Sequence, residues 1–177
     1  MPTYKAIAST TVGAGGASSI TFSSIPGTYT DLVLKISTRD DSAFVTSYLN
    51  LQFNGDSGAY YDQKNVSGML NGTITNQSWP NQNQYYIYQG NAANSTASTF
   101  CNTEVYIPNY TSSSNKSISN DGVAESNTSS SNNRAVALCA GLYHPSSNTA
   151  ITSISLTPAS GNFVQYSTAT LYGIKNS

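Results

Sequence analysis

Apolar and polar residues alternate along most of this chain, and turn residues interrupt the alternation at short intervals. No stretch sustains the spacing of an amphipathic helix, in which apolar residues recur every three or four positions. A period of two predicts strands that bury one face, and the Gly, Pro, Asn and Asp residues between them predict turns. We predict about nine to eleven strands, at residues 4–9, 18–22, 31–38, 48–54, 59–66, 85–88, 99–107, 116–119, 135–142, 149–157 and 163–174.

The alternation also predicts which side chains form the core. Every second residue of a half-buried strand should point inward, and the residues between should face solvent. In the predicted strands 31–38, 48–54 and 99–107, the residues that share the inward face are Leu32, Leu34, Ile36, Leu49, Leu51, Phe53, Cys101, Thr103, Val105 and Ile107. Many short strands separated by turns predict an all-β fold. We expect a single-domain antiparallel β-sandwich, jelly-roll-like, over residues 1–177.

Three segments depart from simple alternation. Residues 135–142 are apolar on both faces, which predicts a central strand. Residues 71–84 are rich in Asn, Gly and Gln and contain Trp79 before Pro80, so we expect a loop there. Residues 126–133 are almost entirely polar and predict an exposed loop.

Composition narrows the classes of function. Charged residues are 8% of the chain and the net charge is −1, whereas about 25% is usual. Ser, Thr and Asn take their place, with 29, 20 and 19 copies. The seven Lys and Arg residues are scattered, so we expect no binding to nucleic acid. Residues 135–142 form the longest apolar run, far below the roughly 20 residues of a membrane span.

Catalytic chemistry has few candidates in this sequence. The single histidine, His144, precedes Pro145 in a predicted turn, and no nucleophile motif accompanies it. The two glutamates are Glu104 and Glu125, and Glu104 is opposite in parity to Val105, so it should point to solvent. We therefore predict a protein that is not an enzyme, with no catalytic residue and no cofactor.

Metal-binding patterns are also weak. Cys101, Cys139 and His144 are three ligand types without zinc spacing. The acidic residues near predicted turns are Asp40, Asp41 and Asp56, and no calcium-loop pattern surrounds them, so turn formation explains them. We predict no metal site. The two cysteines are either buried thiols or a disulfide between strands, and spacing alone does not decide between these.

An aromatic group is the best candidate contact surface. Trp79, Tyr85, Tyr86 and Tyr88 lie close together in the sequence. Such rings offer large contact area at low entropic cost, and sugar rings would stack on them. Alternation sends Tyr86 and Tyr88 to one face and Tyr85 to the other, so the alternative is that some of them fill the core. Trp79, in a predicted polar loop, is the strongest contact candidate.

Several segments of the sequence resemble small virion structural proteins of tailed phages, notably aquatic and cyanobacterial ones. They are MPTYKAIASTTV at 1–12, ITFSSIPGTYTDLVLK at 20–35, LQFNGDSG at 51–58, ISLTP at 154–158 and FVQYSTATLYGI at 163–174. Residues 44–48 and 90–133 lack a matching pattern. The resemblance implies a β-sandwich on the particle, and no catalytic residue is carried over.

Three hypotheses follow from the residues and the resemblance. The first is a capsid decoration or cement protein, in which copies, expected as homotrimers, bind the major capsid protein or other virion proteins. The alternative is a tail or head fibre component that binds host surface glycans through Trp79 and the tyrosines. The third is a free carbohydrate-binding module, which the absence of a secretory signal disfavours. We expect folding in the host cytoplasm, a final location in the virion, and no membrane partner.

Overall fold

The computed structural model describes residues 3–69, 72–124, 135–147 and 149–175. Those residues contain twelve strands and no helix. The strands are β1 (Thr3–Thr11), β2 (Ile20–Phe22), β3 (Asp31–Ser37), β4 (Thr46–Phe53), β5 (Tyr61–Met69), β6 (Ile74–Gln82), β7 (Tyr85–Asn91), β8 (Asn102–Ile107), β9 (Lys116–Ala124), β10 (Ala135–Tyr143), β11 (Ile154–Pro158) and β12 (Thr168–Lys175). Glu125 and the loop predicted at 126–133 lie outside the described residues.

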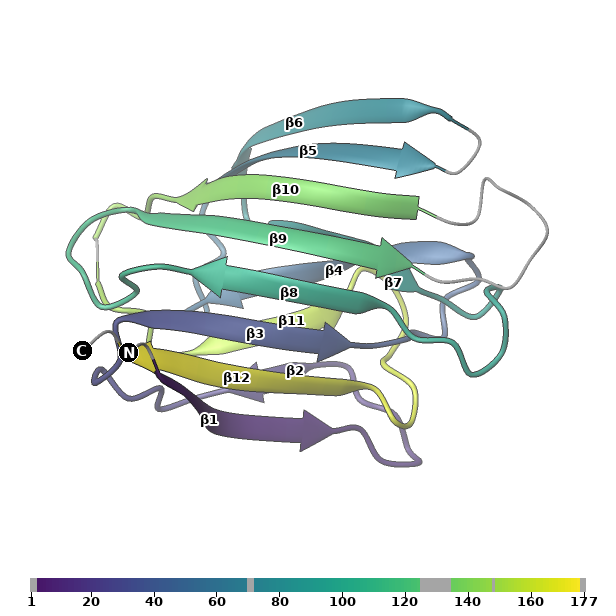
Figure 1. The fold of residues 1–177 in the computed structure, drawn as a ribbon, viewed down its shortest axis with the longest axis horizontal. Coiled ribbons are helices and arrows are strands. Elements are labelled where there is room, and N and C mark those ends of the chain that lie inside the picture. The colour runs from purple at the N-terminus through teal and green to yellow at the C-terminus, as the bar shows by residue number, and fades with distance from the viewer. Residues whose placement is uncertain (1–2, 70–71, 125–134, 148, 176–177) are drawn as a thin grey trace.

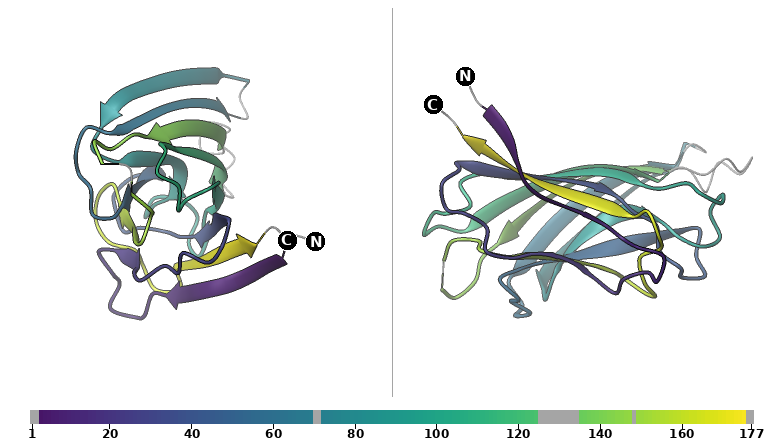
Figure 2. Two further views of the ribbon diagram at one scale, coloured as in Figure 1. Left: turned by 90° about the vertical axis from the view of Figure 1, so that its left-hand side faces the viewer. Right: turned by 90° about the horizontal axis from the view of Figure 1, so that it is seen from below.

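The strands form two antiparallel sheets that pack face to face (Figures 1 and 2). The larger sheet has eight strands in the order β1-β12-β3-β8-β9-β10-β5-β6, and the smaller has four in the order β2-β11-β4-β7. The chain passes repeatedly from one sheet to the other, as in a jelly roll. The predicted all-β antiparallel sandwich is confirmed. Among the described residues, no helix is long and apolar enough to cross a membrane.

The core lies between the two sheets and includes the residues that alternation predicted. Burial of each such aliphatic or aromatic side chain contributes about 1.5–3 kcal/mol. The predicted inward residues are all buried: Leu32, Leu34, Ile36, Leu49, Leu51, Phe53, Cys101, Thr103, Val105 and Ile107. One hydrophobic cluster draws on both sheets, because one face of each sheet is apolar.

The loop expected at residues 71–84 is wrong for most of its length, because β6 occupies Ile74–Gln82. β6 is an edge strand that pairs only with β5. An edge strand tolerates Pro80, since proline removes a donor that only an inner strand would need. Most of the β6 side chains are exposed, so the strand shows no apolar alternation. With β6 included, the described strands exceed the nine to eleven that we predicted.

The predicted central strand is confirmed in its position but is covered on one face only. β10 lies between β9 and β5. Ala137 and Cys139 point into the core, whereas Val136 and Leu138 are 51% and 67% exposed. The smaller sheet covers the inner face of the larger sheet, and in the described chain no further layer covers its outer face.

Candidate functional site

The two sheets differ in width, and the difference creates a groove at one edge. β7 is the last strand of the smaller sheet, whereas the larger sheet continues through β5 to β6 (Figures 1 and 2). The side chain of Gln63 on β5 joins the two sheets here. Its Nε2 donates to the Tyr86 carbonyl at 3.0 Å, and its Oε1 accepts from the Tyr86 N–H at 2.5 Å. A side-chain amide thus replaces a neighbouring strand for β7, and β6 overhangs it.

Four aromatic rings line this groove in a continuous row. Tyr48, Tyr86 and Tyr88 lie on the outer face of the smaller sheet, because their neighbours along β4 and β7 point into the core. The ring centroids of Tyr48 and Tyr88 are 4.5 Å apart. Trp79 approaches from β6, with its centroid 5.4 Å from Tyr88 and 5.8 Å from Tyr86. These separations are those of favourable aromatic pairs.

A chain of neutral hydrogen bonds runs beside the rings. The Tyr48 hydroxyl donates to the Tyr88 hydroxyl at 2.9 Å, and the Tyr88 hydroxyl donates to Gln77 Oε1. The Tyr86 hydroxyl donates to Gln82 Oε1 at 3.3 Å. Burial raises the pKa of Tyr88, so its phenol stays protonated at neutral pH. The aromatic groove is defined here as Tyr48, Gln77, Trp79, Gln82, Tyr86 and Tyr88.

The aromatic groove, of about 400 Å³, adjoins a second hollow of about 510 Å³. Tyr48, Gln77 and Tyr88 line both. The second hollow adds Phe44, which is 58% exposed, together with small hydroxyl-bearing residues such as Ser67. No described residue that lines either hollow carries a charge. The two hollows form an elongated, uncharged binding surface.

One buried amide lies on β5, opposite a residue of the aromatic groove. Asn65 pairs with Gln77 across β5 and β6, between Gln63 and Ser67 on the same face of the sheet. Its side chain is 1% exposed, and neither its Oδ1 nor its Nδ2 has a hydrogen-bond partner in the described structure. An unsatisfied buried amide costs about 1–3 kcal/mol. Asn65 lines neither hollow, so its amide indicates a place for buried water in the sheet rather than a contact for a ligand in the groove.

Three of the four predicted contact residues meet in the groove. Trp79, Tyr86 and Tyr88 lie together there, whereas Tyr85 does not. The prediction that Tyr85 is a contact residue is wrong, because its side chain is fully buried and its hydroxyl donates to Asn120 Oδ1 at 2.8 Å. The parity of these positions was the informative signal, since it separated Tyr85 from Tyr86 and Tyr88.

Sequence reasoning missed Tyr48, Phe44 and Gln77. Tyr48 carried a usable signal, because it is opposite in parity to Leu49 and had to face outward. Gln77 lay in the segment that we expected to be a loop, so its direction could not be predicted.

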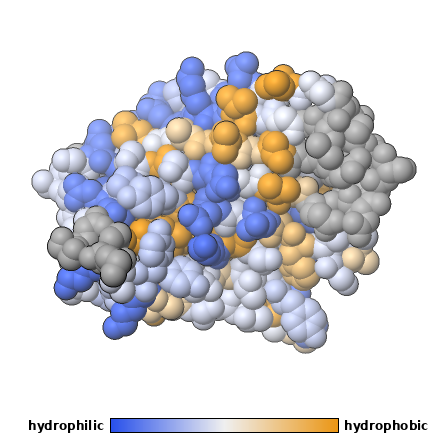
Figure 3. Space-filling view, viewed as in Figure 1, coloured by the Kyte–Doolittle hydropathy of each residue, from blue (hydrophilic) through white to orange (hydrophobic). Residues whose placement is uncertain are grey.

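A second surface lies on the outer face of the larger sheet. Five aliphatic side chains there are 43–75% exposed: Val66, Ile74, Val123, Val136 and Leu138. Leu138 is opposite Val66, and Val136 is opposite Val123, so they adjoin across β5, β10 and β9. Figure 3 shows apolar side chains gathered over this part of the sheet. We call these five residues the apolar sheet face.

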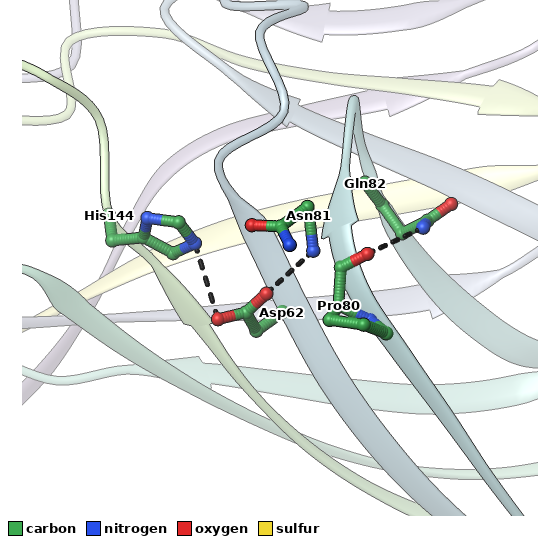
Figure 4. A network of polar contacts seen from close by, with 5 residues as sticks. All are labelled: Asp62, Pro80, Asn81, Gln82 and His144. Atoms are coloured by element: carbon green, nitrogen blue, oxygen red, sulfur yellow. Dashed lines mark hydrogen bonds and ion pairs between the residues drawn. The ribbon is translucent and has the colours of Figure 1, made fainter.

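The histidine lies outside both surfaces. His144 Nε2 is 3.2 Å from Asp62 Oδ2, and Asp62 Oδ1 accepts from the Asn81 N–H at 2.7 Å (Figure 4). These contacts hold the turn after β10 against the β5–β6 hairpin, the role expected of a turn histidine. Glu104 pairs with Lys35 at 3.2 Å and points outward as predicted.

The predicted turn roles of the aspartates agree with their contacts. Asp41 Oδ1 accepts from the Asn162 N–H at 2.7 Å, and Asp56 Oδ1 accepts from the Gly58 N–H at 2.9 Å. Asp40 accepts from the Ser42 N–H at 3.0 Å. No cluster of three or more potential metal ligands occurs among the described His, Cys, Asp and Glu residues.

Both cysteines are free, buried thiols, and the alternative of a disulfide is not realised. Cys101 Sγ is 3.3 Å from the Thr38 Oγ1 atom. Burial raises the pKa of Cys101 and raises that of Cys139 to about 11, so both thiols are protonated at neutral pH.

Comparisons with known proteins give no family. No family model matches the chain, and no curated protein matches it. Among solved structures, the chain is similar to one in the structure of the infectious bursal disease virus Gx strain. That match covers 98% of this chain but 39% of the viral chain, with 14% identity and a TM-score of 0.15. A likeness this low carries no argument about function.

Proposed function

We propose that this chain is a non-enzymatic structural protein of a phage particle, and that it decorates the outer surface of the capsid as a cement protein. The observation that carries the proposal is the apolar sheet face. Five exposed aliphatic side chains on adjoining strands are a surface that gains stability when a partner covers it. Full burial of a Val, Leu or Ile side chain contributes about 1.5–3 kcal/mol, and covering these half-exposed side chains contributes part of that.

The charges around the apolar sheet face indicate the chemistry of its partner. Lys64 borders it on β5 and Asp121 borders it on β9, and both are exposed. Glu104 adjoins Asp121 on β8 and pairs with Lys35. The described charges around the surface therefore balance, so it fits an apolar, nearly uncharged surface of the major capsid protein. The net charge of −1 gives little repulsion between neighbouring copies on a shell.

The fibre alternative has its own support. An aromatic groove with amide and hydroxyl groups suits the recognition of host surface glycans, as a tail or head fibre component would require. The two roles differ in where the copies are found on the particle.

Binding to capsids tests the proposal. Purified protein is mixed with particles that lack it, and co-sedimentation is measured for the wild type, for Leu138→Lys and for Tyr4→Lys. Leu138→Lys places a charge in the apolar sheet face and should weaken binding at least tenfold, roughly 1.4 kcal/mol. Tyr4 is 59% exposed on β1 at the opposite edge of the sheet, so Tyr4→Lys is the matched control and should bind normally.

Antibody labelling of intact particles separates the two roles. Copies spread over the shell support decoration. Copies confined to the tail would contradict it and would favour the fibre alternative. Equal binding of Leu138→Lys and the wild type would remove the apolar sheet face from the contact.

A further inference from the structure

We infer that the aromatic groove binds a neutral carbohydrate, with a sugar ring stacked on Tyr48 beside Trp79 and its hydroxyls bonded to Gln77 and the Tyr48–Tyr88 pair. This inference does not depend on the proposed capsid role, because the groove and the apolar sheet face are different surfaces. It deepens the fibre alternative by naming the class of glycan, and in that respect it rests on that alternative. The groove lies at the inner face of β6 and the outer face of the smaller sheet. The apolar sheet face points away from the smaller sheet.

The aromatic rings contact one another but still expose surface on which a ligand can stack. Tyr48 is 40% exposed and Phe44 is 58% exposed, although both are large apolar residues. Tyr48 meets Tyr88 edge-on, with an interplanar angle of 61°, so Tyr88 does not cover the face of the Tyr48 ring. The axial C–H groups of a pyranose are weakly positive and apolar, and they complement the negative face of such a ring.

The polar groups of the groove match a ligand that both donates and accepts hydrogen bonds. The hydroxyls of Tyr48 and Tyr88 each have acceptor lone pairs, and the Gln77 amide has an NH₂ that its bond from Tyr88 does not use. Sugar hydroxyls supply both functions at close spacing. A proline-rich peptide, which aromatic grooves also bind, supplies carbonyl acceptors but few donors.

The absence of charge selects among carbohydrates. The described residues that line the groove and the adjoining hollow include no Lys, Arg or His. A sialic acid carboxylate or a sulfate would lose its hydration on entering the groove. No described cation there would offset that cost, so binding of an anionic sugar is unfavourable. The structure therefore favours neutral hexose or N-acetylhexosamine units over acidic glycans.

Trp79 provides a direct readout, because it is the single tryptophan of the chain and lies in the groove. Titration of the full chain with a panel of neutral oligosaccharides built from glucose, galactose, mannose and N-acetylglucosamine should shift or quench its emission in a saturable manner for at least one member. Tyr48→Ala should weaken that binding by about tenfold, as loss of one stacking platform predicts. Tyr48→Phe keeps the ring and should weaken binding less.

Several controls make the outcome decisive. Thermal unfolding must show that Tyr48→Ala is folded, which its exposed position favours. Leu138→Lys should bind sugar normally, so failure of the capsid role and failure of the groove are distinguishable. Comparing lactose with 3′-sialyllactose tests whether a negative charge weakens binding. Decaproline tests whether the groove prefers a proline-rich peptide. No response to any neutral sugar, unchanged affinity in Tyr48→Ala, or stronger binding of sialyllactose or decaproline would each overturn the inference.

Discussion

Arg39 shows how a single residue organises a segment without a motif in the sequence. Its side chain is 9% exposed. Nη1 donates to Ser95 Oγ and to the Thr96 carbonyl, both at 2.7 Å, and Nη2 donates to the Ala93 and Ser95 carbonyls at 3.0 and 3.1 Å. One planar guanidinium therefore holds the loop after β7 in place. The sequence could not predict this, because the acceptors are mostly backbone carbonyls that no residue type reveals.

Lysine should not be able to replace the planar guanidinium of Arg39. In Arg39→Lys one ammonium cannot reach all of these acceptors, and buried carbonyls lose their donors. We expect the free energy of unfolding to fall by about 2–3 kcal/mol, measured by urea denaturation. Lys64→Arg, an exposed exchange in the opposite direction, should change it by less than about 0.5 kcal/mol. A stable Arg39→Lys protein would show that the loop is held by other contacts.

The strands illustrate where alternation is informative and where it is not. It predicted β3, β4 and β8 together with their buried faces, because an inner strand must bury one side. It missed β6, because an edge strand with most of its side chains exposed has no constraint on pattern. It also could not predict the groove, since the overhang of β6 beyond β7 depends on the sheet order and not on either strand alone.

A substitution at Gln63 tests how the backbone N–H and carbonyl groups at the edge of β7 obtain hydrogen bonds. In Gln63→Leu the Tyr86 N–H and carbonyl lose their side-chain partners while the volume is nearly kept. We expect destabilisation by about 2–3 kcal/mol and a shift in Trp79 emission, because Tyr86 contacts Trp79. Gln165→Leu, at an exposed loop position, is the control and should be nearly neutral. Unaltered stability of Gln63→Leu would mean that water replaces the amide.

At the scale of the whole molecule, the core depends on tyrosine to an unusual degree. Tyr61, Tyr85 and Tyr143 are buried beside Leu, Ile and Phe residues, and Tyr61 stacks on Tyr143 at 4.8 Å. Tyr143 donates to Asp56 Oδ2 at 2.8 Å. The sequence left open which tyrosines fill the core, and the two-sheet arrangement decides which of them are enclosed.

These tyrosines predict instability in alkali. Burial raises the pKa of Tyr61, Tyr85, Tyr88 and Tyr143 above the value of about 10 in the unfolded chain. Above pH about 10 the unfolded state loses phenolic protons that the folded state keeps, so the free energy of unfolding falls as pH rises. Urea denaturation from pH about 8 to about 11 should show the fall, with tyrosinate absorbance rising as the protein unfolds. A free energy of unfolding that is constant over this range would contradict the prediction.

The pairing of β1 with β12 determines how the molecule would be oriented if it were tethered through either end of the chain. Thr3 is opposite Lys175, so both described ends of the chain emerge at one corner (Figure 2). β1 is one edge strand of the larger sheet and β6 is the other. Seven strand spacings of about 4.8 Å place the two edges about 34 Å apart. A molecule tethered by either end would therefore hold β6, with Trp79, at the edge of its wider sheet that lies away from the tether.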